Sequence, residues 1–96
     1  MAARGVFLSL PFDQIQIAKK SFIRTFSNKV NSEELYWHMD KNDREILVLS
    51  GENWFFQEED KLPIKLSAGD LFTIKKNTWH RVIKGSGSLS VIIKES

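Results

Sequence analysis

The sequence predicts an all-β fold, either an antiparallel sandwich or a small barrel. Short apolar or alternating stretches recur every eight to twelve residues, and turn residues separate them. Only residues 13–20 show helical spacing, with Ile15 and Ala18 on one side, and a β-branched strand suits this segment equally well. Strands at this spacing, with no helices between them, are typical of antiparallel sandwiches and barrels.

The expected strands are bounded by turn residues such as Asn, Asp, Gly and Pro. We expect them at residues 22–26, 34–40, 45–50, 53–57, 64–66, 71–74, 80–84 and 88–94. The stretch from Trp54 to Leu66 has the length of a hairpin. The Gly85-Ser86-Gly87 turn should close a second hairpin, between the strand that begins at His80 and the last strand.

Length and composition describe one ordinary globular domain, spanning residues 1–96. The chain has no cysteine, which excludes disulfides and thiolate metal sites. The formal charge is +2 and the lysines are scattered, so a nucleic-acid backbone is not the expected partner.

The N-terminal apolar run is short, because Pro11 and Asp13 end it before the apolar core of an export signal forms. No stretch has the length needed to span a bilayer. The expected location is therefore the cytoplasm, with no membrane partner.

The two histidines give the sharpest chemical indication. In a strand, alternate residues share a face, so His38 and Asp40 project the same way. A second imidazole, from His80 on a later strand, would complete two histidines and a carboxylate around one divalent metal ion. Fe, Mn, Ni and Zn all accept such a ligand set.

Two ordered motifs carry a family resemblance. The first is His38-Met39-Asp40, four residues, Glu45, five residues and Gly51, and the second runs from Gly69 to His80. This arrangement resembles the small single-domain cupins, whose first motif is Gly-x5-His-x-His-x(3,4)-Glu-x6-Gly and whose second is Gly-x5-Pro-x-Gly-x2-His-x3-Asn. The resemblance covers about residues 37–51 and 69–80, and it implies a jelly roll, also called a double-stranded β-helix.

The sequence departs from these motifs at several positions. Asp40 stands where the second histidine usually lies, and Lys75 and Asn77 replace the proline and glycine of the second motif. The resemblance implies His38, Asp40, Glu45 and His80 as metal ligands. The spacing from Gly51, however, places Arg44 at the glutamate position, and Asp43 is a third alternative there. These alternatives remain open at this stage.

The resemblance implies a small-molecule site in the barrel, without naming the ligand. One hypothesis is a metal-dependent dioxygenase, isomerase or lyase that acts on a small organic molecule. The alternative is a non-catalytic module that binds a sugar or an organic acid without a metal. A 2-oxoglutarate dioxygenase is disfavoured, because only Arg81 follows His80 to anchor the co-substrate. Fold does not choose between enzyme and binder.

Tyr36, Arg44 and Trp54 are candidates for contact with the ligand, although aromatic residues of a small barrel are more often core. Alternation would direct four apolar side chains outward if the histidines point inward. The outward residues are Leu35, Trp37, Trp79 and Ile83. Together with the apolar N-terminal residues Val6, Phe7, Leu8 and Leu10, they predict a homodimer.

Overall fold

The computed structural model describes residues 11–96. It contains eight strands and one short 3-10 turn among these residues. The elements are β1 (Asp13–Ala18), β2 (Ser21–Phe26), η1 (Ser32–Glu34), β3 (Arg44–Gly51), β4 (Phe55–Glu58), β5 (Ile64–Lys65), β6 (Leu71–Ile74), β7 (His80–Ile83) and β8 (Leu89–Glu95). The expected all-β class is confirmed, and residues 13–18 form a strand rather than a helical turn.

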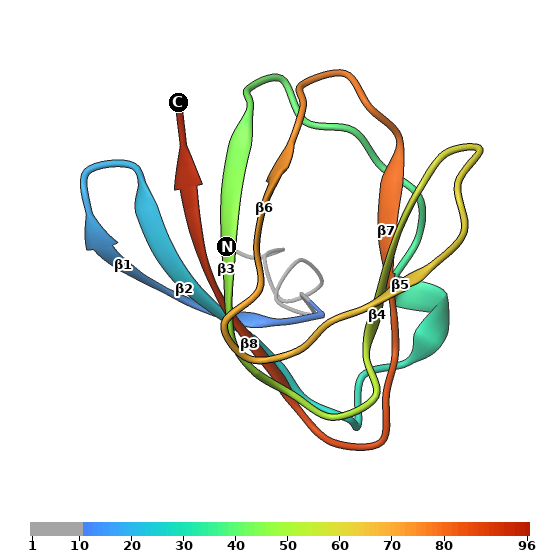
Figure 1. Ribbon diagram of the computed structural model, residues 1–96. Helices are drawn as coiled ribbons and strands as arrows, with labels where there is room; N and C mark the ends of the chain where they lie inside the picture. Colours follow the sequence, from blue (N-terminus) through green and yellow to red (C-terminus); the bar gives the residue numbers. More distant parts are fainter. Residues whose placement is uncertain (1–10) are drawn as a thin grey trace, which may run out of the picture.

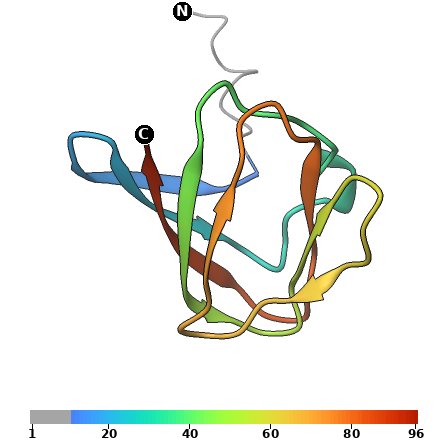
Figure 2. The same ribbon diagram turned by 45° about the horizontal axis from the view of Figure 1, so that its top comes forward.

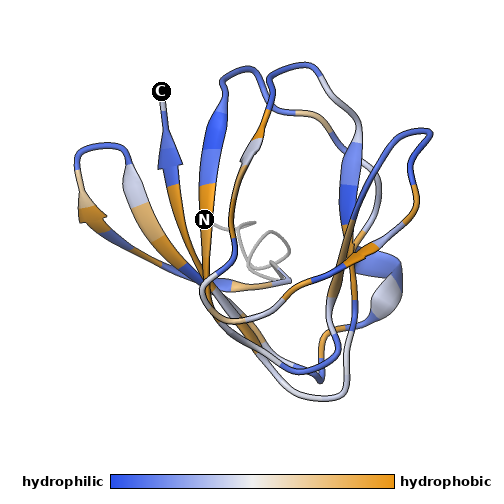
Figure 3. Ribbon diagram, in the orientation of Figure 1, coloured by the Kyte–Doolittle hydropathy of each residue, from blue (hydrophilic) through white to orange (hydrophobic). Residues whose placement is uncertain are grey.

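The strands form two antiparallel sheets that face each other (Figure 1). One sheet has the order β1-β2-β8-β3-β6, and the other has the order β5-β4-β7. This is the jelly-roll arrangement that the sequence predicted. In Figure 3 the hydrophobic colour lies in the lower parts of β3 and β8, whereas their upper ends and the loop between β1 and β2 are hydrophilic.

The core lies between the two sheets, and strand alternation explains its composition. In β8, Leu89, Val91 and Ile93 are buried, and in β3 Ile46 and Val48 are buried. The remaining buried apolar residues are Phe26, Trp54, Phe56, Leu66 and Ile74.

The predicted hairpin between β7 and β8 is wrong. β7 pairs with β4, whereas β8 pairs with β2 and β3, so residues 84–88 cross from one sheet to the other. Gly85 is needed for a different reason than a tight hairpin, because a Cβ there would collide with the backbone of Glu52 and Asn53, whereas a Cβ at Gly87 would meet only the side chain of Glu52. The other predicted hairpin is present, since β4 pairs with β5.

The strand expected at 34–40 is also not regular. Asn31 caps a 3-10 turn through a bond that its Oδ1 accepts from the Glu33 amide at 3.0 Å. The chain then runs extended, and only His38 is bridged, to His80. This turn rotates Leu35 toward the core, so its predicted outward position is wrong.

The loop before β3 is held against the turn between β6 and β7 (Figure 2). Asn77 donates its amide to the Asp40 carbonyl at 2.8 Å, and the Lys76 amide donates to Asp43 Oδ1 at 2.8 Å. Asn77 has φ 61°, in the left-handed region that asparagine tolerates better than most residues, so it makes the turn in place of the motif's glycine. The two motifs are thereby joined at one end of the barrel.

Candidate functional site

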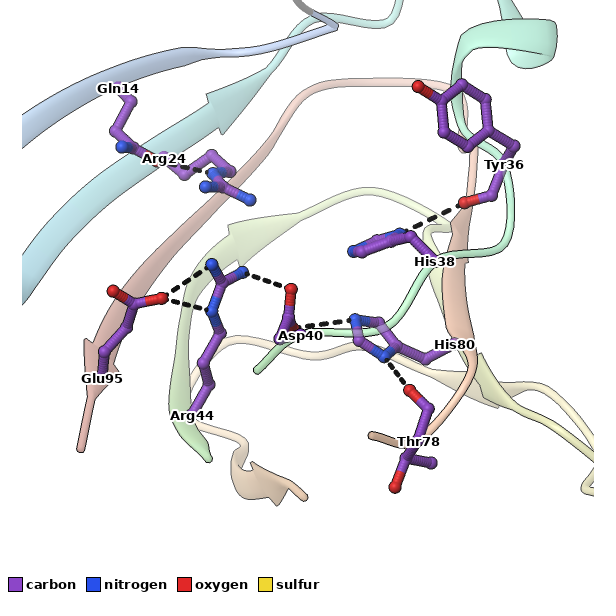
Figure 4. A network of polar contacts seen from close by, with 9 residues as sticks. All are labelled: Gln14, Arg24, Tyr36, His38, Asp40, Arg44, Thr78, His80 and Glu95. Atoms are coloured by element: carbon purple, nitrogen blue, oxygen red, sulfur yellow. Dashed lines mark hydrogen bonds and ion pairs between the residues drawn. The ribbon is translucent and has the colours of Figure 1, made fainter. Parts of the chain in front are cut away.

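Three polar side chains converge inside the barrel at the end where the two motifs meet. One potential ligand atom from each of His38, Asp40 and His80 lies within 4.8 Å of the others. Asp40 Oδ2 is 3.4 Å from His80 Nε2, and the two imidazole ring centroids are 4.3 Å apart. Figure 4 shows His38 and His80 on one side of this cluster and Asp40 beside them.

Backbone carbonyls orient both imidazoles. His80 Nδ1 lies 2.8 Å from the Thr78 carbonyl oxygen, and His38 Nδ1 lies 3.2 Å from that of Tyr36. A carbonyl oxygen only accepts hydrogen bonds, so each Nδ1 must carry the proton. In the neutral form of each ring, Nε2 then keeps its lone pair, and this is the tautomer that coordinates a metal.

The environment of His80 keeps this ring neutral. Burial lowers the pKa of His80, and the neighbouring charges of His38 and Arg44 act in the same direction. The Thr78 carbonyl and Asp40 oppose this effect, but they do not overcome it. His80 is buried, whereas His38 is more exposed.

Asp40 supplies an oxygen that lacks a hydrogen-bond partner. Its Oδ2 is buried and accepts no hydrogen bond among the described residues, whereas Oδ1 is 3.5 Å from Arg44 Nη1. A buried carboxylate oxygen is costly without a partner. A cation beside the two free Nε2 atoms would satisfy it, so the residues present fit a divalent metal ion.

Arg44 occupies the inward position that the spacing from Gly51 predicted, and Glu45 does not. Arg44 lines the cavity, and its Nη2 is 2.8 Å from Glu95 Oε2. Glu45 is exposed on the outer face of β3, so the structure does not bring it to the cluster. Asp43 is also outside the cluster, and its Oδ1 accepts a hydrogen bond from the Lys76 backbone amide.

The cluster opens into a cavity of about 380 Å³. Tyr36 lies at its margin and is 69% exposed. Trp54 does not line the cavity: it is 0% exposed, and its Nε1 donates to the Gly87 carbonyl at 2.8 Å. Most of the lining is apolar, and it includes Phe26, Ile46, Phe56, Phe72, Ile74, Val82 and Ile93.

Three charged residues near the cavity were missed by the sequence analysis: Glu34, which lies in the 3-10 turn, and the strand residues Arg24 and Glu95. Arg24 lines the cavity, and Glu95 pairs with Arg44. Strand alternation could have found both strand residues, because Arg24 is in phase with the buried Phe26 and Glu95 is in phase with the buried Ile93.

The two tryptophans that precede the histidines lie on the outside, as alternation predicted. Trp37 is 38% exposed and Trp79 is 42% exposed. Both border a second, more open cavity, and Arg81 stacks over the Trp37 ring with its Cζ 4.8 Å from the centroid.

Among the described residues, no helix is long and apolar enough to cross a membrane.

Comparison with solved structures finds the same fold. KdgF from Halomonas sp. has a TM-score of 0.69 and 18% identity, over 88% of this chain and 80% of that one. A cupin-2 domain containing protein from Shewanella frigidimarina has a TM-score of 0.65 and 17% identity, over 100% and 94%. Fe(II)-HppE has a TM-score of 0.64 and 18% identity, over 88% of this chain but 48% of its own.

The comparison with curated proteins gives no match. The family model described as Cupin domain matches residues 28–93, which include both motifs and most of the barrel. The chain therefore belongs to the cupin family.

Proposed function

We propose that this chain binds one divalent metal ion through His38, Asp40 and His80, and a small organic ligand in the adjoining cavity. The observation that carries the proposal is the buried Asp40 Oδ2, which has no hydrogen-bond partner in the described part of the chain and faces His80 Nε2. Two imidazoles and one carboxylate suit Fe, Mn, Ni or Zn. Such a set leaves coordination positions open for a ligand.

A bound metal would supply Lewis-acid or oxygen-site chemistry, as a dioxygenase, isomerase or lyase requires. The protein's own residues would orient the metal ligands and shield the bound organic ligand. The Tyr36 and Thr78 carbonyls hold the histidine rings in place, and Arg44 holds Asp40 through its Oδ1 atom. The apolar wall of the cavity excludes water from the bound ligand.

A second candidate function is ligand binding without a metal, as in a sensing module. One observation favours it: Arg44 pairs with both Asp40 and Glu95. These pairs already compensate part of the acidic charge, and a cation at the glutamate position disfavours a nearby metal. The two candidates share the cavity and differ in whether the ion is needed.

Metal analysis of protein purified without chelator separates these candidates. The first predicts about one equivalent of metal, removed by chelator and restored by Fe(II), Mn(II), Ni(II) or Zn(II). If no metal binds above background while a small molecule still co-purifies in the cavity, the second candidate holds. If neither metal nor any small molecule binds, both are wrong.

We also propose that the chain forms a homodimer, through the outer face of the larger sheet. The strand registers align one outward aliphatic residue on each of the five strands: Ile15, Ile23, Ile92, Leu47 and Leu71. Ile15 is 68% exposed and Leu71 is 63% exposed. A continuous apolar row of this kind is more than a monomer usually exposes.

Charge on this face makes it complementary to itself. Lys94 and Glu45 are paired on the adjacent strands β8 and β3, on one side of the aliphatic row. A two-fold axis along the strands, between β8 and β3, would place Lys94 opposite the partner's Glu45. The exposed Glu45 would thus serve assembly. The sequence predicted a dimer from a different surface, Leu35, Trp37, Trp79 and Ile83, together with the N-terminal Val6, Phe7, Leu8 and Leu10, and these N-terminal residues lie outside the described residues.

A further inference from the structure

Arg24 is held in place on two sides, and its terminal nitrogens are left available. It lies on the inward side of β2, where its Nε donates to Gln14 Oε1 at 2.8 Å. Its guanidinium carbon lies 3.8 Å from the centroid of the Phe12 ring, which covers one face of the group. Figure 4 shows the guanidinium turned from Gln14 toward the space beside Arg44.

No carboxylate neutralises this cation among residues 11–96. Glu95 and Asp40 both form ion pairs with Arg44. The Arg24 Nη atoms form no hydrogen bond or ion pair with the described residues. Burial, followed by the charge of Arg44, lowers the pKa of Arg24 to about 10, and Asp40 and Glu95 only partly offset this. The side chain is still charged at neutral pH. Within residues 11–96 it is a poorly solvated cation without a counter-ion.

The other residues of the cavity indicate which kind of ligand would bind to Arg24. Arg24 lines the same cavity as His38 and His80. Glu34 also lines it, but this residue is not among the charges that shift the pKa of Arg24. Apart from these polar groups, Asp40 and Arg44, the lining of the cavity is mostly aliphatic and aromatic. A ligand that suits both parts carries one anionic group and an apolar body.

We propose that Arg24 anchors the carboxylate of the ligand, and that the ligand is a small organic acid with an apolar body. The planar fork of a guanidinium matches two carboxylate oxygens, and an arginine already immobilised by a ring and a glutamine loses little entropy on binding. This inference rests on the proposed function, since it places the ligand in the same cavity. It would exclude a neutral sugar as the preferred ligand.

The test uses phenylacetate and its neutral analogue phenylacetamide, titrated calorimetrically into chelator-treated and metal-loaded protein. Arg24→Gln should weaken phenylacetate binding by about tenfold or more, and leave phenylacetamide unaffected. Arg24→Lys keeps the charge but lacks the planar fork of the guanidinium, so its affinity for phenylacetate should lie between those of wild type and Arg24→Gln. Arg81→Gln is a matched control, because Arg81 also stacks on an aromatic ring and donates to a glutamine, Gln57, but it does not line the cavity.

The outcomes separate this inference from the proposed function. If Arg24→Gln leaves phenylacetate binding unchanged, or weakens both probes equally, the role of Arg24 is wrong while the cavity remains a ligand site. If Arg24-dependent binding of phenylacetate occurs in protein that takes up no metal, the inference stands and the metal proposal fails. If neither probe binds in any form, both the inference and the small-molecule site are wrong.

Discussion

His38 and His80 are bound to each other through their backbones in both directions. The His38 amide donates to the His80 carbonyl at 3.0 Å, and the His80 amide donates to the His38 carbonyl at 2.9 Å. Residues directly opposite in an antiparallel pair present their side chains on the same face. This one bridge therefore fixes the two imidazoles side by side, although 42 positions separate them in the sequence.

Replacing either histidine should remove the metal while leaving the barrel folded. His38→Ala and His80→Ala should each lower affinity for Zn(II) or Mn(II) by at least about tenfold, because two ligands remain instead of three. Their backbone bridge is unaffected by the side-chain change. Calorimetric titration measures the affinity, and circular dichroism confirms the fold. Since His80 is buried and its removal leaves a cavity, His38→Ala is the cleaner variant.

Glu45→Gln is the control for this experiment. Glu45 is the carboxylate that the family motif implied as a ligand, but it is exposed on the outer face of β3. Its replacement should leave metal affinity within about twofold of wild type. A large loss in Glu45→Gln, or none in His38→Ala, would contradict the proposed ligand set.

Alternation of side chains made the candidate site largely predictable from the sequence. Arg44 lies inward because Ile46 and Val48, in phase with it, enter the core, and Glu45 lies outward for the same reason. The sequence alone left these two residues and Asp43 open as the fourth position. The burial pattern of β3 decides between them in favour of Arg44, without establishing a metal.

Two errors arose where alternation does not apply. The Leu35 side chain turns inward because the 3-10 turn after Asn31 breaks the two-residue period. The Asn-Ser-Glu-Glu sequence was a signal for this turn, since a capping asparagine and acids in the first turn favour a helix start. The crossover at residues 84–88 was harder to predict, because glycines serve both hairpins and close approaches.

Arg44→Glu should strengthen metal binding. The substitution removes a cation that is 3.5 Å from Asp40 and adds a carboxylate facing the cluster. We expect affinity for Mn(II) or Zn(II) to rise by about tenfold, and thermal stability of the metal-free protein to fall, because three acids would then lie close together. Thermal unfolding with and without metal measures both effects. Arg81→Glu is the matched charge reversal outside the cavity, and a similar gain there would show a non-specific charge effect.

Arg24→Gln should not destabilise the protein. The pKa of Arg24 is lowered from 12.5 to about 10, so the cation is less favourable in the folded chain than in the unfolded chain at every pH below about 10. A neutral side chain removes that cost, about 1 kcal/mol once partial exposure is allowed for. Thermal unfolding at neutral pH should give a Tm equal to or a few degrees above wild type. A clear decrease would show that Arg24 is held for stability.

Trp54→Phe should weaken the fold without weakening ligand binding. Trp54 is fully buried outside the cavity lining, and the change removes ring volume and the hydrogen bond to the Gly87 carbonyl. The expected loss is about 2 kcal/mol in the free energy of unfolding, from denaturant titration. Phenylacetate affinity should stay at the wild-type value. Loss of affinity in a stably folded Trp54→Phe would restore the ligand-contact role that the sequence suggested.

Leu47→Lys should convert the proposed dimer into a folded monomer. Leu47 lies in the aliphatic row between Ile92 and Leu71, next to the proposed two-fold axis, and a lysine there would be desolvated against the second copy of the chain. Sedimentation at micromolar concentration should show a dimer for wild type and a monomer for the variant, with unchanged metal affinity. Thr73→Lys, on the same face one row away, is the control for added charge. If Leu47→Lys remains dimeric, the contact lies elsewhere, and the exposed Trp37 and Trp79 are the next surface to substitute.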